Sequence, residues 1–341
     1  MFWWTDRYHP VAVPNFDQVG TPPYYALLVI RQLTVFSVPA FLFVSGFFSA
    51  YAVRSSKPAS SWKIARARLY NLIVPYLVWS AVIFLGDVLQ GLTWRPSEYL
   101  KRLALGGADP VYFYVPLLSQ FYLLSPLVVP VAKTRGRWLL FASALLQLGT
   151  ISLQYLSLLG KVQAPILGTM RVLTSSRLFV NWAFFFALGV VSGFHRQQLK
   201  RWLTRYKWCL LVAVVVLGSM MVVESEIVYR LTGKDWRGGA LISGNLYAVA
   251  FLLCFVAFHR VSIRFSGILY QLSRRSYGIY LLHHKVIEFV ARAIRQIVPW
   301  MLAYQALYQP VLVVFGVGAP LLFMAAVAKG PARRAFRYLF G

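Results

Sequence analysis

Acidic residues and cysteines are scarce in this sequence. Only 9 of its 341 residues are Asp or Glu, and charged residues of both signs make up 13% of the chain, about half the share that is usual in soluble domains. The two cysteines, Cys209 and Cys254, lie in apolar runs without metal-ligand spacing, so we expect no disulfide framework and no bound metal. A glycine-rich phosphate loop, a nucleophile elbow and paired catalytic carboxylates are also missing. Together these gaps argue against a water-soluble globular enzyme.

Apolar residues take the place of the missing charges. Hydrophobic residues form 59% of the chain and aromatic residues 16%, and the mean hydropathy is +0.62. A membrane helix needs about 20 mostly apolar residues, and we count nine such stretches, at 24–53, 70–91, 112–132, 138–159, 178–194, 208–224, 241–258, 277–297 and 308–328. The sequence therefore predicts an all-α, polytopic integral membrane bundle, with residues 1–341 forming one domain.

The basic residues gather in alternate loops. The net charge is +26 at pH 7, and most Lys and Arg residues lie in loops without any Asp or Glu, at 54–68, 133–137, 196–207, 260–275 and 329–337. Cytoplasmic loops carry such an excess of basic residues, so we expect these loops and the C-terminus on the cytoplasmic side. The position of the charge between apolar runs argues against a nucleic acid partner. This basic face either attracts anionic lipid headgroups or also binds a phosphorylated cytosolic donor.

One arginine lies inside the first apolar run. Ionisable side chains at membrane depth are costly and mark candidate sites. Arg31 either binds an anionic substrate group or extends to the outer interface.

The stretch SYGIYLLHHK, which begins at Ser276, carries the most polar groups of any apolar run. Helical spacing places Ser276, Tyr280 and His283 or His284 on one face, and Tyr277 lies three residues before Tyr280. A histidine inside a membrane is either an interhelical hydrogen-bonding group or a proton acceptor. Both interpretations stay open for His283.

Four stretches rich in aromatic residues carry a family resemblance. They are SVPAFLFVSGF at 37–47, YFYVPLLSQFYLLSP at 112–126, FVNWAFFFALG at 179–189 and SYGIYLLHH at 276–284. In content and order they resemble the motifs of the acyltransferase 3 family of bacterial integral membrane O-acyltransferases. The resemblance implies one more membrane helix, at the start of the fold, than we count here. It also implies a place in the bacterial plasma membrane.

The same resemblance implies an activity. Family members transfer an acyl group, commonly acetyl, from cytosolic acyl-CoA to a hydroxyl of a sugar, a cell-envelope polysaccharide or a lipid-linked acceptor. Acyl-CoA (acetyl-CoA) would then be a donor substrate, and no bound cofactor is expected.

The catalytic base of the family has no counterpart in this sequence. Members use a histidine on the first helix, with an arginine eleven residues before it, and no such pair occurs near this N-terminus. We expect a first helix upstream of Met1 that carries the base; otherwise His9 or His283 takes this role, or the chain has lost catalysis. The residues that we expect to bind substrate are Arg31, Ser276, Tyr277, Tyr280 and Tyr114.

Two other functions fit the same sequence. A transporter or flippase for a glycan or lipid intermediate would also place Arg and His within the membrane, although we see no inverted repeats of the kind common in transporters. A non-catalytic partner in an envelope-polysaccharide system is the third possibility, because the base is missing. Dependence of acceptor acylation on acyl-CoA separates the first function from the other two.

Overall fold

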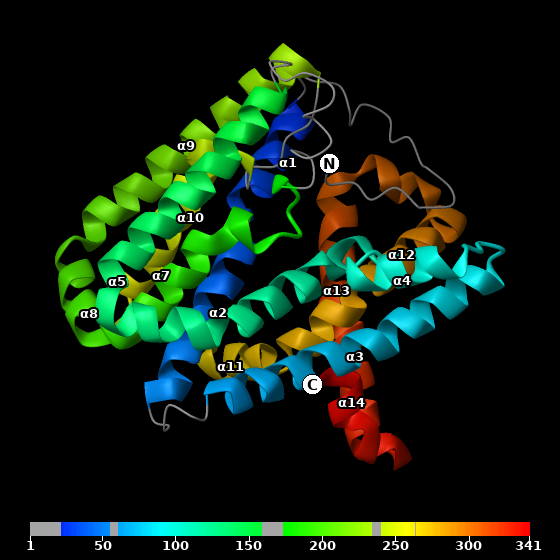
Figure 1. Cartoon of the computed structure of the whole chain (residues 1–341). Coiled ribbons are helices and arrows are strands. Elements are labelled where there is room, and N and C mark those ends of the chain that lie inside the picture. Colours follow the sequence, from blue (N-terminus) through cyan, green and yellow to red (C-terminus); the bar gives the residue numbers. More distant parts are fainter. Residues whose placement is uncertain (1–21, 55–60, 159–172, 234–239, 263) are drawn as a thin grey trace. The chain divides into compact units, whose positions relative to one another are not determined.

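The computed structural model describes residues 22–54, 61–158, 173–233, 240–262 and 264–341. Within these ranges the regular elements are all helices and no strand occurs (Figure 1), which confirms the all-α prediction for this part of the chain. The backbone divides into two compact units, each of which is described by itself. Unit 1 consists of Met1–Leu28, Tyr70–Val115 and Ile263–Gly341, and unit 2 consists of Val29–Leu69 and Pro116–Ser262.

Unit 1 is built around two packed helices, α12 and α13. Its helices are most of α3 (Ser61–Leu89), α4 (Pro96–Ala104), η2 (Pro110–Phe113), α11 (Ser266–Arg274), α12 (Ser276–Ile297), η5 (Pro299–Ala303), α13 (Gln305–Lys329), η6 (Pro331–Ala335) and α14 (Phe336–Phe340). Ala291 of α12 shares an apolar core with Tyr308 and Leu312 of α13. At the C-terminal end, Trp79 Nε1 of α3 donates to Leu339 O over 2.8 Å. These contacts set the position of α12 within the unit.

Unit 2 depends on close contact between helix backbones. Its helices are α2 (Ser37–Arg54), most of α5 (Tyr114–Leu158), η3 (Phe179–Trp182), α7 (Ala183–Phe194), α8 (Arg196–Arg205), α9 (Lys207–Thr232) and α10 (Ile242–Ala257), and α1 (Pro22–Leu33) is shared between the units. A Cβ on Gly189 of α7 would lie 2.0 Å from Phe43 O of α2, so small residues are what lets these helices touch. Glu224 of α9 accepts hydrogen bonds from Tyr155 of α5 and from Ser243 of α10.

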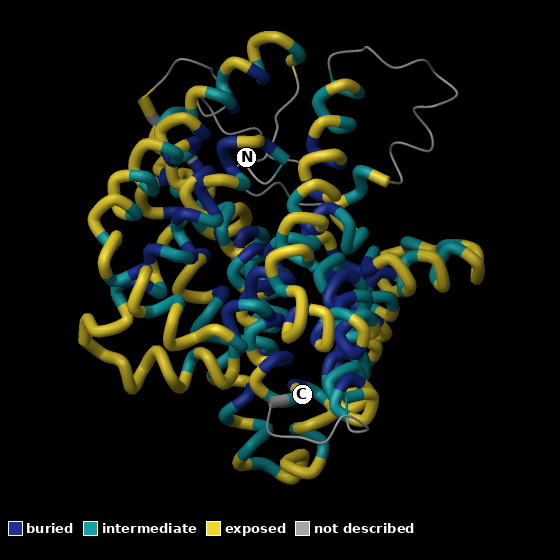
Figure 2. Tube along the Cα trace, turned by 60° about the vertical axis from the view of Figure 1, so that its left-hand side comes forward, coloured by how far each residue is buried: buried dark blue, intermediate teal, exposed yellow. Residues whose placement is uncertain are grey.

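Several helices are long and apolar enough to cross a membrane. Five such segments are Tyr24–Val53, Ser61–Leu89, Pro110–Leu158, Lys207–Thr232 and Gln305–Lys329, and two shorter apolar helices are Phe179–Phe194 and Ile242–Ala257. Large apolar side chains stay exposed along these helices, so that exposed and buried residues alternate along the chain trace (Figure 2). Lipid tails can cover such surfaces, whereas water cannot do so without cost. The chain is a multi-pass membrane protein.

The predicted stretches are helical where the structure describes them, but some boundaries differ. The first stretch, 24–53, consists of two helices, α1 and α2. The break lies where Ser37 Oγ donates to Thr34 O over 2.5 Å and where Pro39 lacks the N–H that would continue the helical ladder. The stretches 112–132 and 138–159 both lie in α5, where non-helical backbone at Arg135 separates two helices between them, as predicted.

The predicted span at 277–297 coincides with α12, which is helical along its whole length. α12 is not among the five long apolar segments. The reason is its composition: His283, His284, Lys285, Glu288 and two arginines interrupt its apolar residues. The structure thus shows where the helices are, and it leaves the predicted number of nine crossings unconfirmed.

Candidate active site

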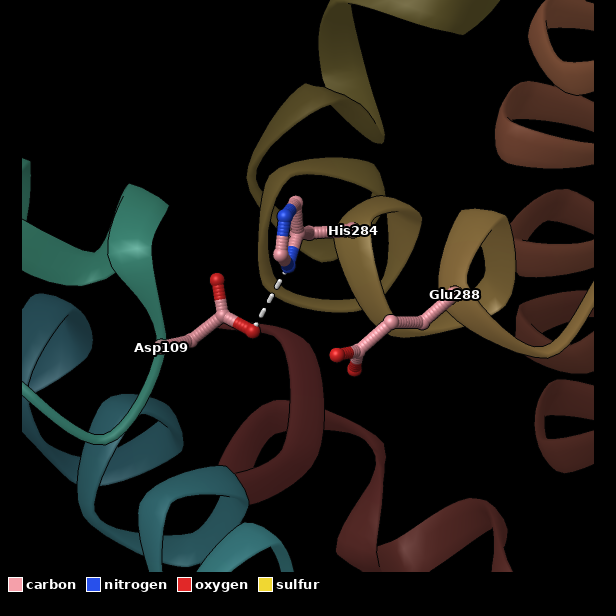
Figure 3. Close-up of side chains that lie close together, drawn as sticks. All are labelled: Asp109, His284 and Glu288. Atoms are coloured by element: carbon pink, nitrogen blue, oxygen red, sulfur yellow. Dashed lines mark hydrogen bonds and ion pairs between the residues drawn. The ribbon is translucent and has the colours of Figure 1, made fainter. Parts of the chain in front are cut away.

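Polar side chains of α12 meet the segment that precedes η2. His284 Nδ1 lies 2.9 Å from Asp109 Oδ2 (Figure 3), and because a carboxylate only accepts hydrogen bonds, the imidazole donates its N–H. Lys285 Nζ lies 2.5 Å from Glu288 Oε2 and 3.8 Å from Asp109 Oδ2. The Asp109 side chain is fully buried, while that of His284 keeps 19% of its exposure. We refer to Asp109, His284, Lys285 and Glu288 as the α12 polar cluster.

The segment before η2 owes its shape to a glycine and an aspartate. Gly106 has a φ of +70°, and a Cβ there would lie 2.5 Å from Tyr112 O, so only glycine fits this position. Asp109 is the N-cap of η2, and its Oδ1 accepts a hydrogen bond from Val111 N over 3.1 Å. Its other oxygen, Oδ2, is thereby directed to His284. One carboxylate both starts η2 and binds α12.

Two tyrosines fasten η2 to α12 in opposite directions. Tyr280 Oη of α12 donates to Val111 O over 2.5 Å, and Tyr112 Oη of η2 donates to Leu281 O over 2.7 Å. Both hydroxyl protons are therefore used within the protein. The hydroxyl oxygens keep lone pairs that can still accept a hydrogen bond.

Aromatic rings surround Tyr280. Its ring centroid lies 5.9 Å from that of Tyr114 in an edge-to-face arrangement and 6.1 Å from that of Tyr277 in a stacked one. The Tyr112 and His283 rings both lie 6.2 Å from the Tyr280 ring. Tyr114, Tyr277, Tyr280 and His283, all predicted from sequence as site residues, are thus brought together in unit 1.

The hydrogen bonds of His283 indicate its tautomer. Nδ1 lies 2.8 Å from Tyr280 O and 3.1 Å from Ile279 O, both in the preceding turn of α12. Carbonyl oxygens only accept hydrogen bonds, so the proton of the neutral ring is on Nδ1. Nε2 then carries the lone pair that a proton acceptor needs.

Charge within the α12 polar cluster favours an ionised Asp109. Burial alone would raise the pKa of Asp109, but the hydrogen bond and charge of His284, the Val111 N–H and the nearby Lys285 ammonium outweigh it. The net effect holds this pKa below its ordinary value.

Three members of the cluster also have donor atoms at metal-binding distances. Ligand atoms of Asp109, His284 and Glu288 lie within 4.8 Å of one another. The same ligand atoms are already engaged within the protein, because the Lys285 ammonium pairs with both carboxylates and His284 Nδ1 donates to Asp109. The residues do not fit a metal site.

Comparison with known proteins identifies the family. The profile of the Acyl_transf_3 family, described as "Acyltransferase domain", matches residues 8–331. The chain belongs to this acyltransferase family. A relative in Bacillus subtilis, "Putative membrane-bound acyltransferase YfiQ", is 25% identical over 262 residues, which cover 74% of this chain and 68% of that protein.

Relatives in Staphylococcus aureus carry a different name. In strain MRSA252, the "Probable poly-beta-1,6-N-acetyl-D-glucosamine export protein" is 20% identical over 268 residues, which cover 76% of this chain and 71% of that protein. The protein of the same name in strain Mu50 / ATCC 700699 matches to the same extent. No solved structure matches the chain.

The remaining site residues expected from sequence are Ser276, Arg31 and His9. Ser276 is the first residue of α12, and its hydroxyl donates to Ser273 O over 2.8 Å. Arg31 lies in the last turn of α1 and belongs to unit 2. His9 lies outside the described residues.

Asp109 has no predicted role, because it lies between the predicted stretches 70–91 and 112–132. In the structure it is buried against α12. A local signal was present, since the run Gly-Gly-Ala-Asp-Pro before the aromatic stretch has the pattern of a tight turn that ends in a helix cap. The pattern predicts the cap but not its partner on α12.

Proposed function

We propose that the protein is a bacterial membrane O-acyltransferase that transfers an acyl group, acetyl in the simplest case, from acyl-CoA to a hydroxyl of a glycan or lipid-linked acceptor. The family match over residues 8–331 carries this proposal. Because that match includes parts of both units, the whole chain acts as one acyltransferase domain. The names of the Staphylococcus aureus relatives contain a polysaccharide, which favours a cell-envelope carbohydrate as acceptor.

The reaction requires one proton acceptor. The acceptor hydroxyl oxygen attacks the thioester carbonyl, a C–O bond forms, the C–S bond breaks, and the hydroxyl proton passes through the base to the thiolate of CoA. An imidazole with a lone pair on Nε2 suits this step near neutral pH. His283 has this form by virtue of its Nδ1 hydrogen bonds to Tyr280 O and Ile279 O, and we propose it as the base, with His9 as the alternative.

The rings around Tyr280 form the acceptor site in this proposal. Tyr114, Tyr277 and Tyr280 offer apolar faces to a sugar ring, and ligand sites combine such faces with a few polar groups. The hydroxyls of Tyr277 and Tyr280 already donate to Leu72 O and Val111 O, so they bind substrate as acceptors. Ser276 adds a hydroxyl one turn earlier.

Arg31 has a separate role in the proposal. It would bind an anionic group such as the phosphate of a lipid-linked acceptor or of the donor, because a guanidinium pairs well with phosphate. Its place in the last turn of α1 is compatible with that role.

The α12 polar cluster positions the site. The hydrogen bond from His284 to Asp109 and the ion pair of Lys285 with Asp109 hold the start of η2 against α12, together with the Tyr280 and Tyr112 bonds. Catalytic groups act efficiently when their neighbours fix their geometry. We therefore assign the cluster a positioning role rather than direct contact with substrate.

The proposal includes a membrane arrangement. Nine crossings result if α12 spans the membrane and if the break at Arg135 divides α5 into two spans, since 45 residues of helix are about 67 Å long at 1.5 Å per residue. The basic loops would then face the cytoplasm of a bacterial cell, where acyl-CoA is found, and the C-terminus with them.

Export of a glycan is the second candidate function. The names of the Staphylococcus aureus relatives favour it, and intramembrane His, Lys and Glu side chains also occur in transport pathways. An exporter would move glycan across vesicles without consuming acyl-CoA.

The test uses the full chain in proteoliposomes, radiolabelled acetyl-CoA and a poly-β-1,6-N-acetylglucosamine oligosaccharide, with lipid-linked glycans as further acceptors. We expect label on an acceptor hydroxyl, and a decrease of about 100-fold or more for His283→Ala, since general base catalysis contributes about 10²–10⁴-fold. The matched control is His259→Ala. His259 follows the end of α10 and also has Nδ1 near a carbonyl three residues earlier, Val256 O at 3.2 Å, but it is exposed.

Each result has a defined meaning. Unlabelled acceptors together with glycan movement into vesicles would contradict the acyltransferase function and support glycan export. Labelled acceptors with equal rates for wild type and His283→Ala would keep the acyltransferase and remove His283 as base.

A further inference from the structure

We propose that α8 is an interfacial helix that binds the headgroups of anionic phospholipids. α8 is short, Arg196–Arg205, and it connects the apolar helix Phe179–Phe194 to the apolar segment Lys207–Thr232. A charged helix between two membrane helices has to lie at the bilayer surface, because its polar groups cannot be covered by lipid tails. The proposal does not depend on the reaction that the protein catalyses.

The basic residues of α8 repel one another in the absence of an anion. Arg196 and Lys200 are four residues apart, as are Arg201 and Arg205, and like charges at this spacing destabilise a helix. The sequence has no Asp or Glu between residues 110 and 223. Among the described residues, none of these four forms an ion pair. The described part of the chain therefore offers these four side chains no carboxylate, and an external anion can take that place.

Aromatic rings accompany these charges at the surface. Trp202 is 64% exposed and Tyr206 39% exposed, and their ring centroids lie 4.9 Å apart. The Arg205 guanidinium lies 5.8 Å from the centroid of the Tyr206 ring. Trp and Tyr are enriched at the level of lipid headgroups, and in soluble surroundings an exposed pair of this size would be unfavourable.

The opposite side of α8 is attached to the protein. Leu203 is buried, and α8 packs against α10. Directly after α8, Lys207 Nζ lies 5.5 Å from the Trp208 ring centroid and 5.8 Å from that of Phe258. The helix thus presents an amphipathic outer surface of basic and aromatic side chains, which is the pattern of helices that lie in the headgroup layer.

A lipid headgroup fits this surface better than a soluble phosphate. The α8 cations lie along an exposed helix and not around a pocket, and a dissolved anion would gain little from such shallow contacts. A phospholipid adds its acyl chains next to Trp202, so that the ring and the charges are satisfied together. The occupant is therefore an anionic phospholipid.

The test is a titration of the detergent-purified full chain with phosphatidylglycerol or phosphatidylcholine, with bound lipid counted by native mass spectrometry. We compare wild type with Arg201→Gln/Arg205→Gln. Each basic residue near a lipid surface contributes roughly a fivefold preference for anionic lipid, so the double variant should bind phosphatidylglycerol about 25-fold more weakly. Its binding of phosphatidylcholine should stay the same.

The matched control loses the same charge elsewhere. Arg333→Gln/Arg334→Gln changes two exposed arginines of η6 and should retain the phosphatidylglycerol affinity of α8. An equal loss of phosphatidylglycerol affinity in both double variants would show that only the net charge matters, and it would overturn the assignment of the lipid site to α8. Displacement of phosphatidylglycerol by free CoA from wild type, but not from Arg201→Gln/Arg205→Gln, would assign α8 to a soluble phosphate instead.

A second variant covers the case in which charge removal disturbs folding. Trp202→Ala keeps all charges and removes the exposed ring. It should weaken binding of both lipids, and unchanged binding would overturn the interfacial placement. Thermal unfolding in neutral detergent checks the folding of each variant. The Tm of Arg201→Gln/Arg205→Gln should not fall, because this double variant removes repulsion within α8.

Discussion

Replacement of Gly189 by alanine should separate α2 from α7. A Cβ at this position would lie 2.0 Å from Phe43 O, whereas ordinary contacts begin at 3.4 Å. The obstacle is backbone, so it cannot rotate away as a side chain would. The two helices have to move apart by more than an ångström, and this movement breaks neighbouring contacts where α2 crosses α7.

The crossing is tight at several points, which limits the ways it can adapt. A Cβ on Gly46 of α2 would lie 2.3 Å from Phe186 O, and one on Gly193 of α7 would lie 2.9 Å from Phe47 O. Small residues at such spacing are what allows membrane helices to approach closely. A shift that relieves the clash at Gly189 therefore opens contacts at the other two glycines.

The expected cost of Gly189→Ala is about 2 kcal/mol. Overpacking of a well-packed interior costs about 1–3 kcal/mol, and the rigid backbone contact places this case at the upper end. Alanine regains roughly 0.5–1 kcal/mol of helix propensity relative to glycine. A change of about 2 kcal/mol corresponds to a decrease in Tm of roughly 3 °C for a chain of 341 residues, since the unfolding entropy is about 2.1 cal/mol/K per residue.

The assay is thermal unfolding of the detergent-solubilised protein, measured as the fraction of protein that stays monodisperse at each temperature. The matched control is Gly149→Ala in α5 of the same unit, where a Cβ would meet nothing within 4 Å. This control should leave the Tm unchanged or raise it slightly. Equal Tm values for the two variants would show that α2 and α7 are not in backbone contact.

Three further predictions concern η2 and α12. Tyr280→Phe removes the hydrogen bond to Val111 O and should lower the free energy of unfolding by about 1 kcal/mol, measurable in the same assay. Lys285→Met leaves the buried Asp109 and Glu288 carboxylates without their ammonium, and we expect the free energy of unfolding to decrease by up to about 3 kcal/mol. The variant Lys285→Met/Glu288→Met should recover part of this free energy. No recovery would argue against the Lys285–Glu288 ion pair. The pKa of Asp109 in the folded protein lies below its ordinary value. The ionised carboxylate therefore contributes fully to the stability of the fold above the unfolded pKa of about 4, and this contribution is lost as the pH falls through the folded pKa. The Tm measured from pH 6 to pH 3 should therefore decrease less steeply in Asp109→Asn than in wild type.

The helical architecture could be predicted from sequence because hydropathy and helix length are local properties. Every stretch that we expected to be helical is helical where described. The boundaries were harder to predict, since the break between α1 and α2 depends on a side-chain bond from Ser37 to Thr34 O. The division of α5 into two helices at Arg135 agrees with the predicted stretches 112–132 and 138–159, because the basic residues at 133–137 interrupt the apolar run.

The candidate site was predictable on one helix only. Helical periodicity placed Tyr277, Tyr280 and His283 on neighbouring turns of α12, and the structure confirms that their rings lie close together. Their roles in substrate binding and catalysis remain predictions. Asp109 escaped notice because no local pattern links it to His284, 175 residues away.

The sequence by itself determined that this protein is helical, lies in a membrane and belongs to an acyltransferase family. These properties follow from composition, charge distribution and the order of motifs, all of which can be read along one dimension. Only the tertiary structure decided that Asp109 faces His284 and that Lys285 pairs with both Asp109 and Glu288. Contacts of this kind depend on the path of the chain between α4 and η2, where Gly106 adopts a positive φ and returns a polar loop to α12. The free energy of a buried charge depends on which neighbours that path brings near, and no local stretch of sequence contains this information.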